Sequence, residues 1–303
     1  MAVKMEVALG ALKMKNPVTT ASGTFAAGRQ YSEFFDLREL GAVTTKGVSL
    51  GPWAGNDSPR IAETPSGMLN SIGLQNPGVE AFCAGDLAWL SQQNVPIIVN
   101  VSGHSAGEYA AVIERLEEEP AIGAYELNIS CPNVDSGGMT FGVDPKASAA
   151  VISSCRAATK RPMIVKLTPN ITDITVIAKV AEAEGADAVS LINTLLGMAI
   201  DARRRRAVLA RKVGGMSGPA VKPVALRMVH EVYHAVQIPI VGMGGISTGV
   251  DAVEFMLAGA TAVAVGTANF ANPRAAADVA RGIEEFCEAE GVSDVHELIG
   301  ALE

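Results

Sequence analysis

The chain has 303 residues, of which 49% are hydrophobic, and its 24 lysines and arginines against 32 aspartates and glutamates give a formal net charge of −8. Such an acidic chain is a poor candidate for nucleic-acid binding, which depends on basic surfaces. Its four cysteines are widely spaced and form no Cys-x-x-Cys pair, which fits a reducing compartment and excludes an iron–sulfur ligand set.

The start of the chain predicts neither secretion nor membrane insertion. Residues 1–7 lack the apolar core of a signal peptide, and no uninterrupted apolar run reaches membrane-spanning length. We therefore expect a cytoplasmic protein without membrane contact.

Eight short apolar segments rich in Val, Ile, Ala and Thr recur along the chain. They are residues 18–25, 42–49, 96–103, 124–131, 162–169, 188–194, 238–246 and 262–270. Segments that are apolar almost throughout are typical of strands buried on both faces of a parallel sheet. Eight such strands alternating with helical patterns, without a break in composition, predict one α/β domain over residues 1–303, a (β/α)8 TIM barrel. A doubly wound sheet is the alternative, but no Gly-x-Gly-x-x-Gly opens a first βα unit.

Glycines and caps mark where the predicted helices begin and end. Gly41, Gly185 and Gly259 belong to a weak internal repeat, and we expect each to take the left-handed C′ position that ends a helix. Ser217 is expected to cap a helix that has a proline in its first turn. Residues 4–15 predict a short hairpin that plugs the bottom of the barrel.

The most informative segment is Glu-Leu-Asn-Ile-Ser-Cys-Pro-Asn at 126–133, which precedes a glycine-rich stretch. Apolar and polar residues alternate from Leu127 to Cys131, which predicts a strand that Pro132 ends. A thiol at a strand end, beneath a loop with glycine hinges, is typical of an active site that closes over its substrate. A buried structural thiol is the alternative for Cys131.

In a barrel, the active groups lie at the C-terminal ends of the strands. The last two predicted strands end in glycine-rich turns, where backbone N–H groups can approach an anion and each loop leads into a helix N-terminus. They predict a phosphate site formed by Gly244, Gly245, Gly266 and Thr267, with Gly218 contributing. Tight turns without a ligand are the alternative. The other residues at the strand ends include Ala21, Ser22, Lys46, Gly47, Asn100, Asn128, Lys166, Ile192, Asn193 and Thr194.

Two lysines, Lys46 and Lys166, stand inside otherwise apolar predicted strands. Because an unpaired buried ammonium group is very costly, each is expected to meet an anionic or electron-rich ligand. A structural salt bridge is the alternative for each lysine.

Four asparagines offer amide donors and acceptors to a ligand, and three of them lie in or directly after predicted strands. They are Asn70, Asn128, Asn133 and Asn193. The alternating N–H and C=O edges of a pyrimidine ring match such amides well. Turn formation, the usual role of an isolated asparagine, is the alternative.

The most basic stretch is the arginine run at 203–206. A charge run of this kind is usually a solvated face, and the sharper hypothesis is a rim that contacts an acidic or cofactor-bearing surface of a partner. His230 and His234 are spaced to share one helix face but have no third ligand, so we expect no metal site.

Seven segments, in order, closely resemble those of class 1B dihydroorotate dehydrogenases, and the resemblance covers nearly the whole chain. They lie at residues 16–17, 45–48, 70–77, 126–145, 165–169, 217–228 and 244–246. The Gly-Gly and Phe-Gly-Val-Asp-Pro continuation of the cysteine segment looks like the branch whose partner subunit passes electrons to NAD. The resemblance therefore implies the FMN-bearing catalytic subunit of such an enzyme.

The resemblance implies oxidation of dihydroorotate to orotate in pyrimidine biosynthesis, with Cys131 taking a proton from C5 as a hydride leaves C6 for the flavin. It places Lys166 against the flavin, where it stabilises the reduced anionic form, and Lys46 against both flavin and substrate carboxylate. The implied substrate-binding residues are Lys46, Asn70, Ser71, Ile72, Gly73, Leu74, Asn128, Asn133, Asn193 and Thr194. The implied FMN-binding residues are Ala21, Ser22, Lys46, Gly47, Asn100, Asn128, Lys166, Ile192, Gly218, Gly244, Gly245, Gly266 and Thr267.

The resemblance also implies an electron-transfer partner subunit that carries FAD and a [2Fe–2S] cluster, for which this chain lacks the cysteines. A homodimer at the core of a heterotetramer is the family expectation, with NAD as the final acceptor. The arginine run at 203–206 departs from the less basic loop expected of the family. Three other functions stay open: a pyrimidine reductase similar to dihydropyrimidine dehydrogenase, a non-redox phosphate-binding barrel and a catalytically silent binding subunit.

Overall fold

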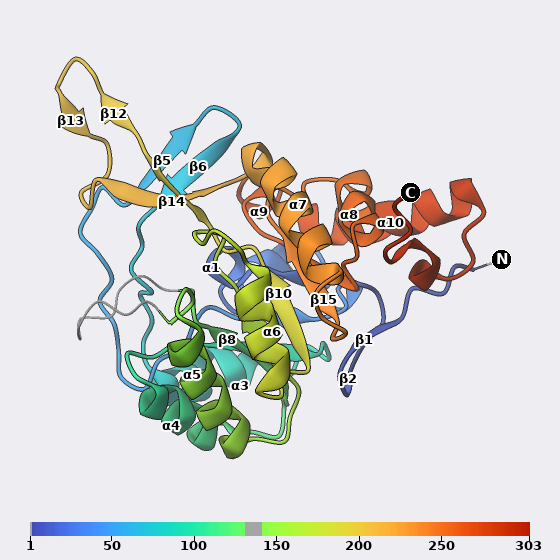
Figure 1. Cartoon of the computed structure of the whole chain (residues 1–303), viewed down its shortest axis with the longest axis horizontal. Coiled ribbons are helices and arrows are strands. Elements are labelled where there is room, and N and C mark those ends of the chain that lie inside the picture. The colour runs from blue at the N-terminus through green and yellow to red at the C-terminus, as the bar shows by residue number, and fades with distance from the viewer. Residues whose placement is uncertain (1, 131–140) are drawn as a thin grey trace.

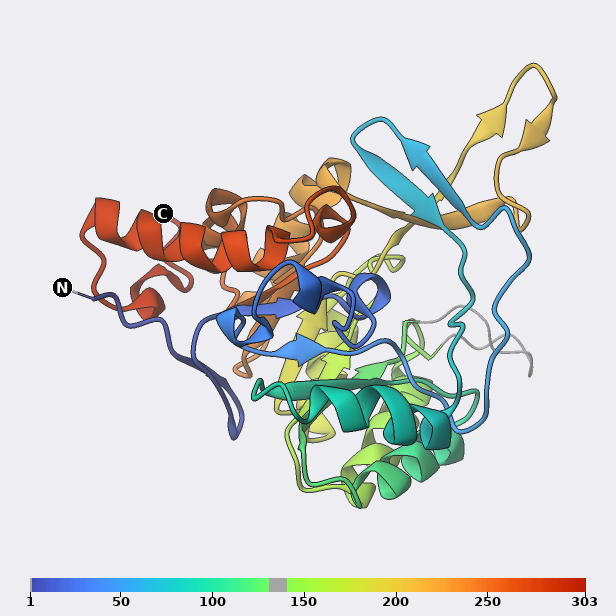
Figure 2. The ribbon, with the colours of Figure 1, turned by 180° about the vertical axis from the view of Figure 1, so that it is seen from behind.

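The computed structural model describes residues 2–130 and 141–303. Eight parallel strands form a sheet that curves almost into a closed barrel, with helices around its outside (Figures 1 and 2). In chain order the barrel strands are β3 (Val18–Thr20), β4 (Val43–Thr44), β7 (Ile97–Val101), β8 (Ile122–Asn128), β9 (Met163–Lys166), β10 (Ala188–Leu191), β15 (Ile240–Met243) and β16 (Ala262–Val265). Each pairs with the next from β4 to β16, and β16 pairs with β3. The predicted (β/α)8 barrel is confirmed, and each predicted segment overlaps one of its strands.

The strands end earlier than the apolar pattern predicts. After β3, for example, Ser22–Phe25 forms the short helix α1, and β8 ends at Asn128. Ile129 and Leu167 lie just beyond strand ends and are nevertheless fully buried. The turns at this end of the barrel are also buried, so their residues are apolar like those of the strands. Composition alone therefore does not mark where the hydrogen-bonded strands end.

The outer helices each bury one face against the barrel. They are α2 (Val79–Phe82), α3 (Ala88–Leu90), α4 (Ala106–Leu116), α5 (Pro145–Ala158), α6 (Thr175–Ala183), α7 (Lys222–Tyr233), α8 (Gly249–Leu257), α9 (Ala268–Ala271) and α10 (Ala275–Glu290). In α4, for instance, Tyr109, Val112, Ile113 and Leu116 are buried, which is the three-and-four spacing of a single helix face.

Ser217 does not cap a helix, contrary to the prediction. Helix α7 begins at Lys222, after a 3₁₀ turn η4 (Pro219–Val221), and its N-cap makes no side-chain hydrogen bond. The Ser217 hydroxyl instead accepts a hydrogen bond from Thr267 at 2.8 Å. This hydrogen bond joins two segments that are 50 residues apart in the sequence. Local sequence patterns therefore carry no signal for it.

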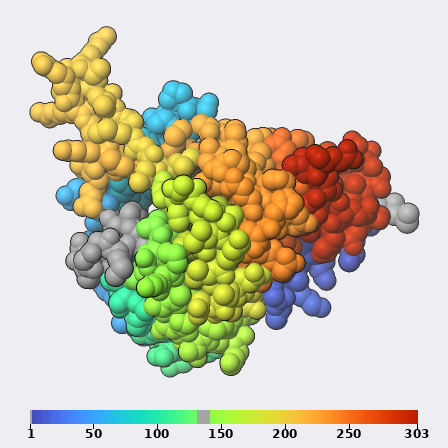
Figure 3. Space-filling model, in the orientation of Figure 1, coloured from blue at the N-terminus to red at the C-terminus, as the bar shows by residue number. Residues whose placement is uncertain are grey.

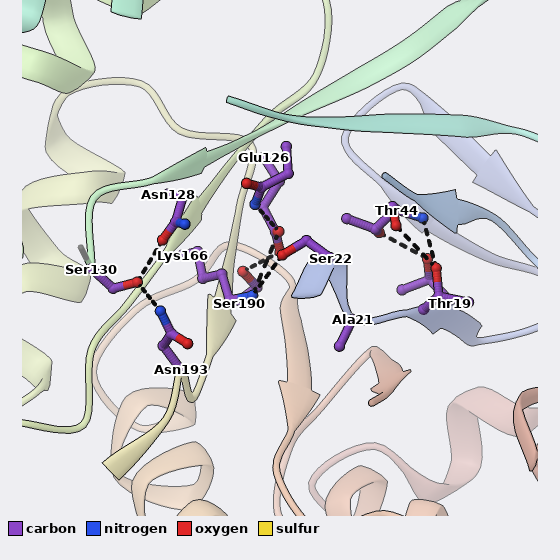
Figure 4. Close-up of polar contacts among 12 residues, drawn as sticks. Thr19, Ala21, Ser22, Thr44, Glu126, Asn128, Ser130, Lys166, Ser190 and Asn193 are labelled. Carbon is purple, nitrogen blue, oxygen red and sulfur yellow. Dashed lines mark hydrogen bonds and ion pairs between the residues drawn. The ribbon is translucent and has the colours of Figure 1, made fainter. Parts of the chain in front are cut away.

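Side chains complete the barrel between its first two strands. β3 and β4 share no backbone ladder, but the Thr44 N–H donates to Thr20 Oγ1, and that hydroxyl donates back to the Thr44 carbonyl, both at 3.1 Å. The hydroxyls of Thr19 and Thr44 lie 3.0 Å apart (Figure 4). All three threonines are buried, so these bonds satisfy groups that the missing ladder would otherwise leave unpaired.

The predicted N-terminal hairpin is confirmed as β1 (Val7–Leu9) and β2 (Leu12–Met14), an antiparallel pair. Its alternate residues, Val7, Leu9, Leu12 and Met14, are buried. They face the N-terminal end of the barrel, where Leu12 packs closely over Gly123 near the start of β8.

Two of the three glycines expected to end helices do so with positive φ. Gly185 follows α6 at φ +85°, and Gly259 follows α8 at φ +116°. The prediction is wrong for Gly41, which has no positive φ. There, a Cβ atom would lie 2.0 Å from the Asn16 carbonyl oxygen, so glycine is required by a close approach of the chain rather than by a helix end.

This contact gives a stability prediction. Gly41→Ala is expected to lower the free energy of unfolding by about 3 kcal/mol, because the neighbouring atom is backbone and cannot turn away. Gly107→Ala is the matched control: a Cβ there meets nothing within 4 Å, and alanine favours the helix by up to about 1 kcal/mol. Urea unfolding measures both, and an equal stability for the two variants would contradict the close approach at Gly41.

An antiparallel sheet stands beyond the C-terminal end of the barrel. It consists of β5 (Ile61–Thr64), β6 (Gly67–Asn70), β11 (Leu195–Met198) and β14 (Val213–Ser217), in the order β11-β14-β6-β5. A hairpin of β12 (Ile200–Asp201) and β13 (Arg206–Ala207) extends from it and projects from the body of the molecule (Figures 1 and 3). We call these six strands the arm. The sequence around Asn70 predicts a loop over residues 68–77, and this is wrong for Met68–Asn70. They pair with the neighbouring β5 and with β14, which lies about 145 residues further along the chain.

Candidate active site

A cavity of about 730 Å³ lies at the C-terminal ends of the barrel strands, bounded on one side by the arm. This volume is within the range of sites that hold a cofactor or drug-sized ligand. The site residues expected from the sequence that line it are Ala21, Ser22, Lys46, Gly47, Asn70, Ser71, Ile72, Gly73, Leu74, Asn100, Asn128, Lys166, Ile192, Asn193, Thr194, Gly218, Gly244, Gly245, Gly266 and Thr267. Cys131 and Asn133 lie outside the described residues.

Lys166 ends β9 with its ammonium group buried at the floor of this cavity. The side chain is 6% exposed, and Nζ donates to Ser22 Oγ at 3.2 Å. The Glu126 carboxylate lies 3.9 Å away, on the neighbouring strand β8 (Figure 4). The predicted burial of this cation is therefore correct, and its charge is matched by a carboxylate that the sequence analysis did not select.

A chain of polar side chains joins the ends of β8 and β10. Ser130 Oγ donates to Asn128 Oδ1 at 2.6 Å and accepts from the Asn193 amide (Figure 4). Tyr109 on α4 donates to the Asn128 carbonyl at 2.7 Å and so holds the end of the strand. Among the described residues, the Asn128 amide N–H groups have no acceptor, which leaves them for a ligand.

The arm brings Asn70 to the same cavity. The Asn70 amide donates to the Gly215 carbonyl on β14 at 3.3 Å. A Cβ at Gly215 would lie 2.0 Å from Thr194 Oγ1, so only glycine lets β14 pass this close to the end of β10. Asn70 and Thr194, from distant parts of the sequence, thus meet at one wall of the cavity.

Glycine-rich turns form another part of the cavity lining. Gly218, Gly244 and Gly245 have φ values of +99°, +124° and +84°. Among the described residues, the backbone N–H groups of Gly244, Gly245 and Gly266 have no acceptor, as an anion site requires.

The N-terminus of helix α8 is closed by its own cap. Thr248 and Asp251 form a capping box, and Asp251 also pairs with Lys222 at 2.6 Å. The turn at Gly244 and Gly245 is therefore the part of this segment that lines the cavity with available donors, rather than the helix terminus.

The chain is similar to known proteins over nearly its whole length. A family model described as dihydroorotate dehydrogenase matches residues 4–287. The curated protein "Dihydroorotate dehydrogenase B (NAD(+)), catalytic subunit" of Alkaliphilus oremlandii is 58% identical over 298 residues, with 98% of each chain covered. Its namesake in Lachnoclostridium phytofermentans is 59% identical over 296 residues, at the same coverage. The chain belongs to the dihydroorotate dehydrogenase family.

The family fold extends to distant members. A crystal structure from Eimeria tenella, of the family's enzyme in complex with ferulenol, superposes with a TM-score of 0.82 at 22% identity. It covers 98% of this chain and 88% of that one. In this chain, no helix of the described residues is long and apolar enough to cross a membrane.

Three residues of this dihydroorotate dehydrogenase family member were missed by the sequence analysis. Ser130 lies within the informative segment and links two predicted asparagines. Glu126, from the same segment, and Ser190 on β10 lie inside the barrel and bond to each other at 2.7 Å. The sequence did carry a signal for Ser130 and Glu126, since a polar residue inside an apolar predicted strand needs a buried partner.

The three described cysteines are expected to be unreactive. Burial raises the pKa of the Cys83 thiol to about 11 and that of Cys155 to about 12, and it also raises the pKa of Cys287. At pH 8, a thiol with a pKa of 11 is ionised in only about one molecule in a thousand. Iodoacetamide at pH 8 should therefore modify one thiol per native chain, Cys131, and none after Cys131→Ser. Mass spectrometry counts the adducts, and modification of Cys83 in the native chain would contradict the expectation.

Proposed function

We propose that the chain oxidises dihydroorotate to orotate in pyrimidine biosynthesis, with bound FMN as the immediate oxidant and NAD as the final acceptor. The proposal is supported by the groups that meet at one cavity in a chain of this family. They are two lysines, three asparagine amides and a set of backbone N–H groups without acceptors among the described residues. The relatives' name, a NAD(+) catalytic subunit, supports the acceptor.

The residues around the cavity suit FMN. Its phosphate would lie at the turns of Gly244, Gly245 and Gly266, whose N–H groups lack acceptors among the described residues. The buried Asn100 Oδ1 also has no partner there, and a ring N–H of the flavin would satisfy it. Lys166 would face the electron-rich ring. When bound, FMN supplies a two-electron acceptor for the substrate.

The chain's own residues hold the substrate and move its proton. Asn70, Asn128 and Asn193 would bind the pyrimidine edges, and Lys46 would bind the carboxylate. Cys131 would take the C5 proton as thiolate. The electron pair of the C5–H bond would then form the C5–C6 double bond, and the hydride would leave C6 for FMN, the two-electron acceptor. Each bond broken is thus matched by one formed, and the product is orotate.

The first test is a spectrum of the purified chain before and after addition of dihydroorotate without oxygen. A yellow protein that bleaches is the expected result, because bound FMN loses its visible absorbance on reduction. A yellow protein that bleaches only with dihydrouracil would instead support the pyrimidine reductase function. A colourless protein that FMN cannot reconstitute would exclude the proposal.

For the electron path, we infer a partner subunit that carries FAD and a [2Fe–2S] cluster, bound to a homodimer of this chain. No group of three His, Cys, Asp or Glu residues that could hold a metal occurs within residues 2–130 and 141–303. The relatives' designation as a catalytic subunit also supports a second subunit.

The basic tip of the arm is the proposed contact with this partner. The four arginines at 203–206 are exposed at the end of the β12–β13 hairpin. Reversing all four to glutamate is expected to weaken partner binding at least tenfold at low salt, because charge complementarity governs such encounters. The control reverses four exposed cations elsewhere: Lys13, Lys160, Arg227 and Arg281. Equal binding by both variants, measured by co-purification and titration, would remove the tip from the interface.

A further inference from the structure

A buried carboxylate lies below the cavity without lining it. Glu126 is 3% exposed, on β8. Its Oε2 accepts a hydrogen bond from the Asn100 amide at 2.6 Å. Its Oε1 accepts one from the Ser190 hydroxyl at 2.7 Å (Figure 4). Residues of β7 and β10, which lie on either side of β8 in the sheet, thus fix both carboxylate oxygens, and the group has little freedom to turn away.

Only one cation lies close to this carboxylate among the described residues. Lys166 Nζ is 3.9 Å from Glu126 Oε2, and both side chains are at most 6% exposed. The other groups bonded to the pair are neutral: Asn100 and Ser190 on the carboxylate and Ser22 on the ammonium group. Because both side chains are buried, each charge is felt strongly by the other.

The position of the pair has a consequence for the ligand. Lys166 lines the cavity and Glu126 does not, so Glu126 acts on a bound group through Lys166 and through its own field rather than by contact. A carboxylate this close to the lysine offsets part of the positive potential that the lysine presents to the cavity.

We propose that Glu126 is a positioning residue that holds the Lys166 ammonium group in place and lowers the reduction potential of the bound flavin by offsetting its charge. The proposal rests on the proposed function, since it requires FMN in the cavity. Reduction adds negative charge to the flavin, and the full positive charge of Lys166 would favour the reduced form more than the neutral pair does. Glu126 therefore keeps the flavin a sufficiently weak oxidant to pass its electrons onward.

The test is the midpoint potential of bound FMN in the parent chain and in Glu126→Gln, titrated at pH 6. The variant is expected to favour reduced FMN about tenfold more than the parent, which is about 30 mV for a two-electron couple. Ser190→Ala is the matched control: it removes one hydrogen bond to the carboxylate and keeps the charge. It should lower the melting temperature of the FMN-free chain and leave the potential near that of the parent.

The outcomes separate the inference from the proposed function. If the parent does not bind FMN, the proposed function fails. If the parent binds FMN and Glu126→Gln has the same or a lower potential, the proposed role of Glu126 is wrong. A purely structural role would lower the melting temperature of both variants without raising the potential of either. If Glu126→Gln does not fold, Glu126→Asp is used instead, because its shorter side chain places the carboxylate about one methylene farther from Lys166. A flavin midpoint potential unchanged from the parent would likewise overturn the proposal.

Discussion

Replacing Cys131 with serine is expected to slow the reduction of bound FMN by dihydroorotate by a factor of about 10² to 10⁴, the usual contribution of a positioned general base. A serine hydroxyl is a far weaker proton acceptor at neutral pH than a thiol with a usual pKa near 8.5. FMN should remain bound with the same affinity, because the residues implied to hold it, apart from Asn128, lie on other strands and loops. Stopped-flow absorbance under anaerobic conditions measures the rate.

The pH dependence of this step provides an independent check on the same residue. The base acts as thiolate, so the rate for the parent chain should rise with pH through the pKa of that thiol and then level off. In Cys131→Ser this rise should disappear. The buried cysteines cannot replace it, because their raised pKa values keep them protonated through this range. A variant that is reduced as fast as the parent at every pH would exclude Cys131 as the base.

The sequence was sufficient to predict which residues meet at the cavity, although it gave no distances. In a parallel barrel, the residues that follow each strand converge at one end, so placing the eight strands also places Lys46, Asn100, Lys166 and Asn193 together. The rule tolerates errors in strand length. These residues therefore line one cavity, as expected, even where β8 ends earlier than its pattern indicates.

What the sequence did not reveal depends on contacts between distant segments. The pairing of β6 with β14 joins residues about 145 positions apart, and the side-chain bonds between β3 and β4 depend on the closure of the barrel. Gly41 looks like the two helix-ending glycines, yet it is required by the Asn16 carbonyl. Such contacts exist only in the assembled fold, so they cannot be predicted from local periodicity or from turn residues.

The second large effect is expected at Lys166. Lys166→Met should lower the free energy of unfolding of the FMN-free chain by about 3 kcal/mol, because it leaves the Glu126 carboxylate buried without a nearby cation. Lys146→Met, at an exposed position on α5, is the control and should change stability by less than about 0.5 kcal/mol. Urea unfolding at neutral pH measures both variants, and a similar stability for the two would show that Lys166 does not offset the Glu126 charge.

The double variant Lys166→Met with Glu126→Gln separates this charge effect from simple loss of packing. If the deficit comes from an unmatched charge, removing the carboxylate should recover most of it, since neutral pairs commonly replace buried ion pairs without loss of stability. The double variant should therefore fold well but no longer present a cation to the cavity. Stability alone then gives no reason for a lysine at this position, whereas a ligand that gains negative charge does. The same pair of substitutions thus tests whether Lys166 serves the site rather than the fold.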